Sequence, residues 1–112
     1  MIVGVCRVEL SLPGNDSLKG KRAVVRRALD RIRARFEISA AEVDLQDHHR
    51  RAVLGFAVVS SNGRIANRIL DQVVAYLEKD GGAPIVSREM ELVHFGDEAL
   101  GEGAGGWDDG SI

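Results

Sequence analysis

The sequence contains few of the residues that cross-link, kink or decorate small domains. Its 112 residues include one cysteine, two prolines, one tryptophan, one tyrosine and three phenylalanines. Because Cys6 is alone, an intramolecular disulfide and a metal site built on several thiolates are both excluded. A single thiol also fits a reducing compartment, so we expect a cytoplasmic protein.

The sequence also lacks a long apolar run. Its N-terminal segment, MIVGVCRVELSL, is interrupted by Arg7 and Glu9, and no basic stretch precedes it. This segment is too short to cross a bilayer and lacks the arrangement of a signal peptide, so we expect no membrane association. The chain is 45% hydrophobic and long enough for one domain with its own core.

Charge is distributed unevenly along the chain. The formal net charge is -2, but residues 97–112 carry five acidic residues and no lysine or arginine, which leaves 15 basic and 12 acidic residues in the rest. The same C-terminal segment is rich in glycine and poor in apolar residues. Such a composition cannot bury enough surface to offset the entropy of ordering. We therefore predict one domain over residues 1–96 and an acidic, glycine-rich, disordered tail over residues 97–112.

Hydrophobic periodicity predicts six elements in the order βαββαβ. Alternation predicts strands over residues 2–12, 40–46, 51–60 and 85–95, and apolar repeats at three and four predict helices over residues 18–36 and 64–79. Short connections and right-handed crossovers place both helices on one face of a four-stranded antiparallel sheet. The predicted class is α+β, with a ferredoxin-like arrangement. This fold hosts many functions and does not by itself indicate one.

Several short motifs resemble one known family. They are Ser17-Leu18-Lys19-Gly20-Lys21-Arg22, a basic helix that ends in Arg35-Phe36, then Ala41-Glu42-Val43 and Val53-Leu54-Gly55. In this order they resemble the YlxP-like family of uncharacterised bacterial proteins over about residues 1–96. The resemblance implies a ferredoxin-like fold. Genes of that family tend to lie among translation and ribosome-maturation genes, so it also implies an RNA- or ribosome-related role, with ribosomal RNA or a ribosomal particle as the partner.

The first helix is the most basic part of the chain, since it carries eight lysines and arginines against the single acid Asp30. Positive side chains on a rigid helix suit phosphate oxygens. The residues we expect to contact nucleic-acid phosphate are Lys19, Lys21, Arg22, Arg26 and Arg33. The alternative is a solvated face on which some arginines pair with Glu42, Asp44 or Glu78.

Lys21 has two interpretations. Its position on the helical wheel lies within the apolar stripe, near Val25 and Ala28. A buried lysine with an altered pKa could take part in chemistry. Alternatively, a lysine in the first turn of a helix can extend its ammonium group outward to solvent.

No catalytic or cofactor-binding set emerges from the sequence. The segment from Gly14 to Lys21 fails as a phosphate-binding loop because five residues separate its glycines and Arg22 stands where a hydroxyl is needed. His48 and His49 are adjacent and would point to opposite sides of a strand, which favours a polar hairpin tip over a metal site. We therefore predict a non-enzymatic protein without a cofactor.

The sheet face away from the helices is predicted to be apolar. The residues expected on it are Val3, Val5, Val53, Ala57 and Val59. An uncovered patch of this kind marks a contact surface, and it lacks the aromatics that RNA-binding sheets of this topology use for stacking. Two hypotheses follow. In the first, the chain is an accessory protein that binds RNA through the basic helix. In the second, it is a homodimeric interaction module that uses this face and has no nucleic-acid role.

Overall fold

The computed structural model describes residues 1–96, and the predicted tail, residues 97–112, lies outside the described residues. The elements are β1 (Ile2–Ser11), α1 (Leu18–Arg35), β2 (Ser39–Asp44), β3 (Arg51–Ser60), α2 (Gly63–Asp80) and β4 (Ile85–His94). The predicted order βαββαβ is therefore confirmed.

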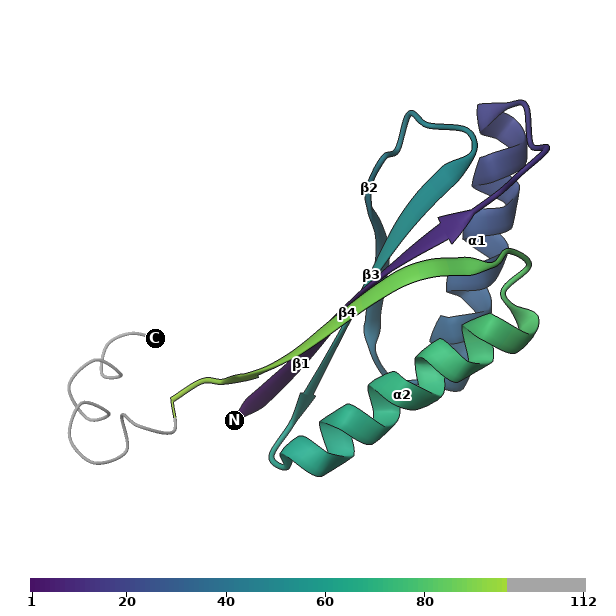
Figure 1. Cartoon of the computed structure of the whole chain (residues 1–112). Helices are drawn as coiled ribbons and strands as arrows, with labels where there is room; N and C mark the ends of the chain where they lie inside the picture. Colours follow the sequence, from purple (N-terminus) through teal and green to yellow (C-terminus); the bar gives the residue numbers. More distant parts are fainter. Residues whose placement is uncertain (97–112) are drawn as a thin grey trace.

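The strands form one antiparallel sheet in the order β2-β3-β1-β4. Both helices lie against the same face of this sheet, and no element within residues 1–96 covers the other face (Figure 1). This is the ferredoxin-like arrangement predicted from the periodicity. Neither helix within residues 1–96 has the combination of length and apolarity that crossing a bilayer requires.

The core lies between the helices and the sheet. Val8 and Leu10 of β1, Leu54 of β3, Ile32 of α1 and Leu70 of α2 have no exposed surface. Buried residues occupy alternate positions on the strands and positions three or four apart on the helices. The periodicity in the sequence therefore identifies the strand and helix faces that pack together.

Gly4 allows α2 to approach the sheet closely. A Cβ atom at this position would lie 2.9 Å from Leu70 Cδ1 and 3.3 Å from side-chain atoms of both Leu92 and Val58. Because those side chains surround the position on three sides, the absence of a side chain at Gly4 is a packing requirement of the helix layer.

The second strand ends earlier than predicted. It stops at Asp44, and Leu45 adopts a left-handed backbone with φ of 56°. Leu45 N donates to Asp44 Oδ1 at 2.7 Å, and His48 N donates to Leu45 O at 3.0 Å. Leu45 O also accepts a hydrogen bond from Lys21 Nζ. The alternation through Gln46 therefore did not reveal the turn, because a lysine distant in sequence helps to hold it.

Candidate functional site

The exposed side of α1 carries four cations that have no partner within residues 1–96. They are Lys19, Arg22, Arg26 and Arg27, all of them exposed, and their side chains make no hydrogen bond or ion pair with any described residue. Lys19, Arg22 and Arg26 are spaced by three and four residues, so they form one row about 10 Å long. Unpaired cations in a row along a rigid helix can neutralise successive phosphates.

The remaining arginines of α1 are engaged elsewhere. Arg31 Nη1 donates to Asp80 O at 3.1 Å, and the Arg35 guanidinium carbon lies 4.6 Å from the centre of the Tyr76 ring. Arg33 donates to Ala40 O and lies 3.9 Å from Asp30 Oδ1. Of the arginines predicted to contact phosphate, the structure leaves Arg22 and Arg26 free and turns Arg33 toward the edge of the sheet.

Lys21 does not fit its predicted role as a phosphate contact. Its side chain has no exposed surface, and its ammonium group donates to Leu45 O at 2.6 Å, Gln46 O at 3.2 Å and Arg51 O at 3.2 Å. The lysine therefore neither extends to solvent nor faces a cavity where a substrate could lie. It joins the start of α1 to the loop between β2 and β3.

Glu42 completes the surroundings of Lys21. Glu42 Oε2 lies 2.8 Å from Lys21 Nζ, and no other group within residues 1–96 donates a hydrogen bond to this oxygen. An ammonium group has three N–H donors, and here three carbonyls and one carboxylate oxygen surround it. Glu42 thus neutralises the buried charge by proximity, and Lys21 and Glu42 form a structural pair.

The two histidines lie at the same end of the molecule as Lys21. His48 Nδ1 accepts from Arg50 N at 3.2 Å, and His49 O accepts from the side-chain amide of Asn15. The first bond lies within the β2–β3 loop, and the second ties this loop to the segment before α1. Within residues 1–96, no group of three or more His, Cys, Asp and Glu side chains is placed to hold a metal ion.

The uncovered face of the sheet holds most of the residues predicted for it. Strand register puts Val3 beside Val59, and Val5 beside Ala57. Val53 corrects the prediction, because it lies in the same alternate series of β3 but has no exposed surface. Its cross-strand neighbours are Glu9 and Asp44, and Glu9 forms an ion pair with Arg51. Val53 is therefore not available for contact with a partner.

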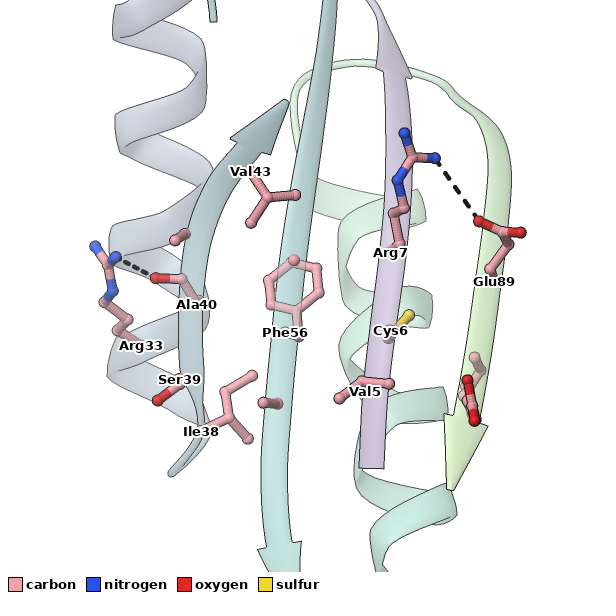
Figure 2. Close-up of a pocket in the computed structure, with 15 residues that line it drawn as sticks. Val5, Cys6, Arg7, Arg33, Ile38, Ser39, Ala40, Val43, Phe56 and Glu89 are labelled. Atoms are coloured by element: carbon pink, nitrogen blue, oxygen red, sulfur yellow. Dashed lines mark hydrogen bonds and ion pairs between the residues drawn. The ribbon is translucent and has the colours of Figure 1, made fainter. Parts of the chain in front are cut away.

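A hollow of about 960 Å³ lies on this face, over β2, β3 and β1 (Figure 2). Small residues account for its depth: Gly55 and Ala57 lie on β3 and Ala41 on β2. Val5, Val43 and Ile38 supply larger apolar side chains around them. Val43 leans over Gly55, since a Cβ atom on Gly55 would lie 2.8 Å from Val43 Cγ1.

The two rims of the hollow carry opposite charge. Arg33 lies at the outer edge of β2, whereas Glu89 lies on β4 at the other side (Figure 2). Glu91, two residues further along β4, also lines the hollow. Arg7 stands between them on β1, 3.7 Å from Glu89 Oε1 and 3.6 Å from Asp44 Oδ2. Glu91 has no partner within residues 1–96.

Cys6 lies under the hollow but belongs to the core. Its side chain is 4% exposed, and burial raises the pKa of its thiol above the usual value; the Arg88 charge opposes this effect and Asp71 adds to it. Because the thiolate is the reactive form, the raised pKa of Cys6 suits a packing residue of the core. Phe56 is likewise buried on the helix side, as its alternation indicates.

Part of the site was not predicted from the sequence. Arg27 was left out of the phosphate-contacting set, although its exposed wheel position was a usable signal. The hollow was also missed. Its signal was the pair of small residues, Gly55 and Ala57, at alternate positions of an otherwise bulky strand.

Comparison with known proteins identifies relatives and supports the fold. Residues 3–90 match the family described as "Protein of unknown function (DUF503)". The uncharacterized protein YlxP of Bacillus subtilis (strain 168) is 34% identical over 77 residues, which cover 69% of this chain and 84% of that protein.

Among solved structures, a de novo designed protein with a ferredoxin fold is similar, with a TM-score of 0.50 and 16% identity, over 87% of this chain and 89% of its own. A dimeric ferredoxin-like protein from an uncultured marine organism has a TM-score of 0.39 and 11% identity, over 83% of this chain and 92% of its own.

Proposed function

Because the chain belongs to the DUF503 family of proteins of unknown function, we propose its role from its surface: a non-enzymatic, cytoplasmic accessory protein that binds RNA through α1. The observation that carries this proposal is the set of unpaired cations Lys19, Arg22, Arg26 and Arg27. Elsewhere on α1, arginines are held by carbonyls, an acid or an aromatic ring.

The geometry favours phosphate contacts over base recognition. Three of the four cations follow one row of a helix that is fixed to the sheet by a buried stripe, so their spacing is rigid. No aromatic residue lies within α1 for base stacking. Binding of this kind is insensitive to sequence and weakens steeply with salt. Ribosomal RNA is the partner we propose, since structured RNA offers closely spaced phosphates.

The test is binding of a labelled ribosomal RNA fragment by fluorescence anisotropy over a series of salt concentrations. Four phosphate contacts predict a slope of log K against log salt of about -3 for single-stranded RNA to about -4 for a duplex. Reversing two charges by Arg22→Glu with Arg26→Glu should weaken binding by at least about tenfold and flatten that slope.

A matched control is available on the other helix. Arg64 and Arg68 are exposed and also four residues apart, and their side chains have no partner within residues 1–96. Arg64→Glu with Arg68→Glu changes the net charge equally but should leave binding nearly unchanged. Equal losses in both double variants would mean that RNA responds to net charge alone. That result, or wild-type protein that does not bind, would contradict the proposal.

A further inference from the structure

The uncovered face of the sheet is too apolar to be explained as a solvent-facing surface. Val5, Val43, Val59 and Val93 are 37%, 49%, 66% and 39% exposed, and all four lie on this side of the sheet. Apolar side chains gathered on one face mark a contact surface. We propose that the face binds a second copy of this chain, with the two sheets packed face to face about a two-fold axis that runs along the strands.

The strand order makes the face suitable for pairing with itself. In the order β2-β3-β1-β4, the midpoint of the sheet falls between β3 and β1. A two-fold axis along the strands at this midpoint exchanges β1 with β3 and β4 with β2. Each strand of one sheet then lies over a strand that is not its own copy in the partner. Large side chains on one strand can therefore pack against small side chains on the other.

The shapes agree with this exchange. Val5 pairs in register with Ala57, and Arg7 pairs with Gly55. Across the proposed axis, Val5 would therefore face the partner's Ala57, and Arg7 would face the partner's Gly55. Side chains from β1 of each copy would enter the hollow over β3 of the other, so two hollows would be filled at once.

The charges on the two rims of the hollow are also complementary across this axis. The exchange of β4 with β2 brings Glu91 of one copy over the edge at which the partner's Arg33 lies, and the reverse contact forms on the other side. A two-fold axis across the strands would instead place β4 over β4, so that acidic rims would meet, and β3 over β3, so that hollows would face hollows. Like charges in contact disfavour that arrangement.

The area suits a stable dimer. Three strands of ten residues and one of six, separated by about 4.8 Å, give the four-stranded face a projected area of about 600 Å². A standard interface buries about 800 Å² of accessible surface on each partner. Accessible area exceeds projected area on a surface with ridges and a hollow, so the two values are of the same size.

The experiment is sedimentation equilibrium on the full 112-residue chain without RNA, so the outcome does not depend on the proposed function. Wild-type protein should be a dimer. Val5→Lys should weaken association by at least about a hundredfold, because it buries a charge at the centre of the interface. Ile65→Lys is the control: Ile65 is 38% exposed, like Val5, but lies on α2, and this change should leave the dimer intact.

Charge exchange tests the direction of the axis. Arg33→Glu and Glu91→Arg should each weaken the dimer by about tenfold, and the two changes together in one chain should restore most of the affinity. Circular dichroism verifies that each variant is folded. A monomeric wild-type chain, a dimer that survives Val5→Lys, or a double charge exchange no tighter than its single variants would overturn the proposal.

Discussion

At the scale of single residues, Lys21 shows that a basic residue counted in the sequence need not be available to bind a partner. Three carbonyls and Glu42 surround its ammonium group, and its side chain has no exposed surface. Such an arrangement holds a loop in place, since every donor has a fixed acceptor. The carbonyl of Leu45, a residue in the left-handed region, is one of those acceptors, so the lysine stabilises an unfavourable backbone conformation.

Lys21→Met should therefore destabilise the protein severely. The change removes one donor from each of three carbonyls, of which Leu45 O keeps its bond from His48 N, and leaves Glu42 as an uncompensated, largely buried charge. The expected loss is about 3–5 kcal/mol in the free energy of unfolding. Urea denaturation followed by circular dichroism measures it. Lys19→Met is the control, because Lys19 is exposed and unpaired, and should change stability by less than about 0.5 kcal/mol.

A second substitution distinguishes the stability lost through the unpaired charge of Glu42 from the stability lost through altered packing. If Glu42→Leu is added to Lys21→Met, the unpaired buried charge disappears, and part of the lost stability should return. A Lys21→Met protein within about 1 kcal/mol of wild type would contradict the structural role.

At the scale of elements, the packing of α2 on the sheet depends on Gly4. A methyl group there would meet Leu70 Cδ1 at 2.9 Å, so the fully buried side chain of Leu70 would have to shift within the core. Gly4→Ala should lower the free energy of unfolding by about 1–3 kcal/mol. The same denaturation experiment measures this loss.

Gly63→Ala provides the comparison, because Gly63 lies on α2 itself, the helix that packs over Gly4. Its new methyl group would meet only Leu92 Cδ1, at the ordinary distance of 3.5 Å, and the position is the first of α2. Alanine there should leave stability unchanged or raise it by less than about 1 kcal/mol. Equal losses at both positions would mean that the close approach of α2 at Gly4 is not what the structure indicates.

The positions of the elements could be predicted from the sequence, but some of the contacts between them could not. Alternation in β1 and the three-and-four repeat of α2 gave their positions within a few residues, because local burial determines both patterns. The end of β2 was wrong by two residues, since Leu45 turns where Lys21 holds its carbonyl. The availability of Arg31 and Arg33 could not be predicted either: Arg31 and Arg33 donate to carbonyls of Asp80 and Ala40, and no composition or spacing reveals a backbone partner.

At the scale of the whole molecule, the two proposals place their surfaces on opposite sides. Both helices cover one face of the sheet (Figure 1), so a dimer formed through the other face would leave α1 of each copy on the outside. Each dimer would then present two rows of unpaired cations, separated by two sheets and the helix layers, or about 30 Å. An RNA long enough to reach both rows would bind more tightly than a short one, through effective concentration alone.

The net charge of the whole chain predicts that the C-terminal segment weakens RNA binding. Removing residues 97–112 changes the formal net charge from -2 to +3, because all five charges in that segment are acidic. The truncated chain should bind RNA several-fold more tightly at low salt. The gain should vanish at about 1 M salt, where the Debye length falls to about 3 Å. Fluorescence anisotropy with the ribosomal RNA fragment measures both conditions.

A full-length variant distinguishes charge from chain length. Asp97→Asn, Glu98→Gln, Glu102→Gln, Asp108→Asn and Asp109→Asn together remove the same five charges without shortening the chain. If long-range repulsion is the reason, this variant should bind RNA as tightly as the truncated one and show the same loss of advantage with salt. Tighter binding by the truncated chain alone would instead show that the segment obstructs α1 by its presence and not by its charge.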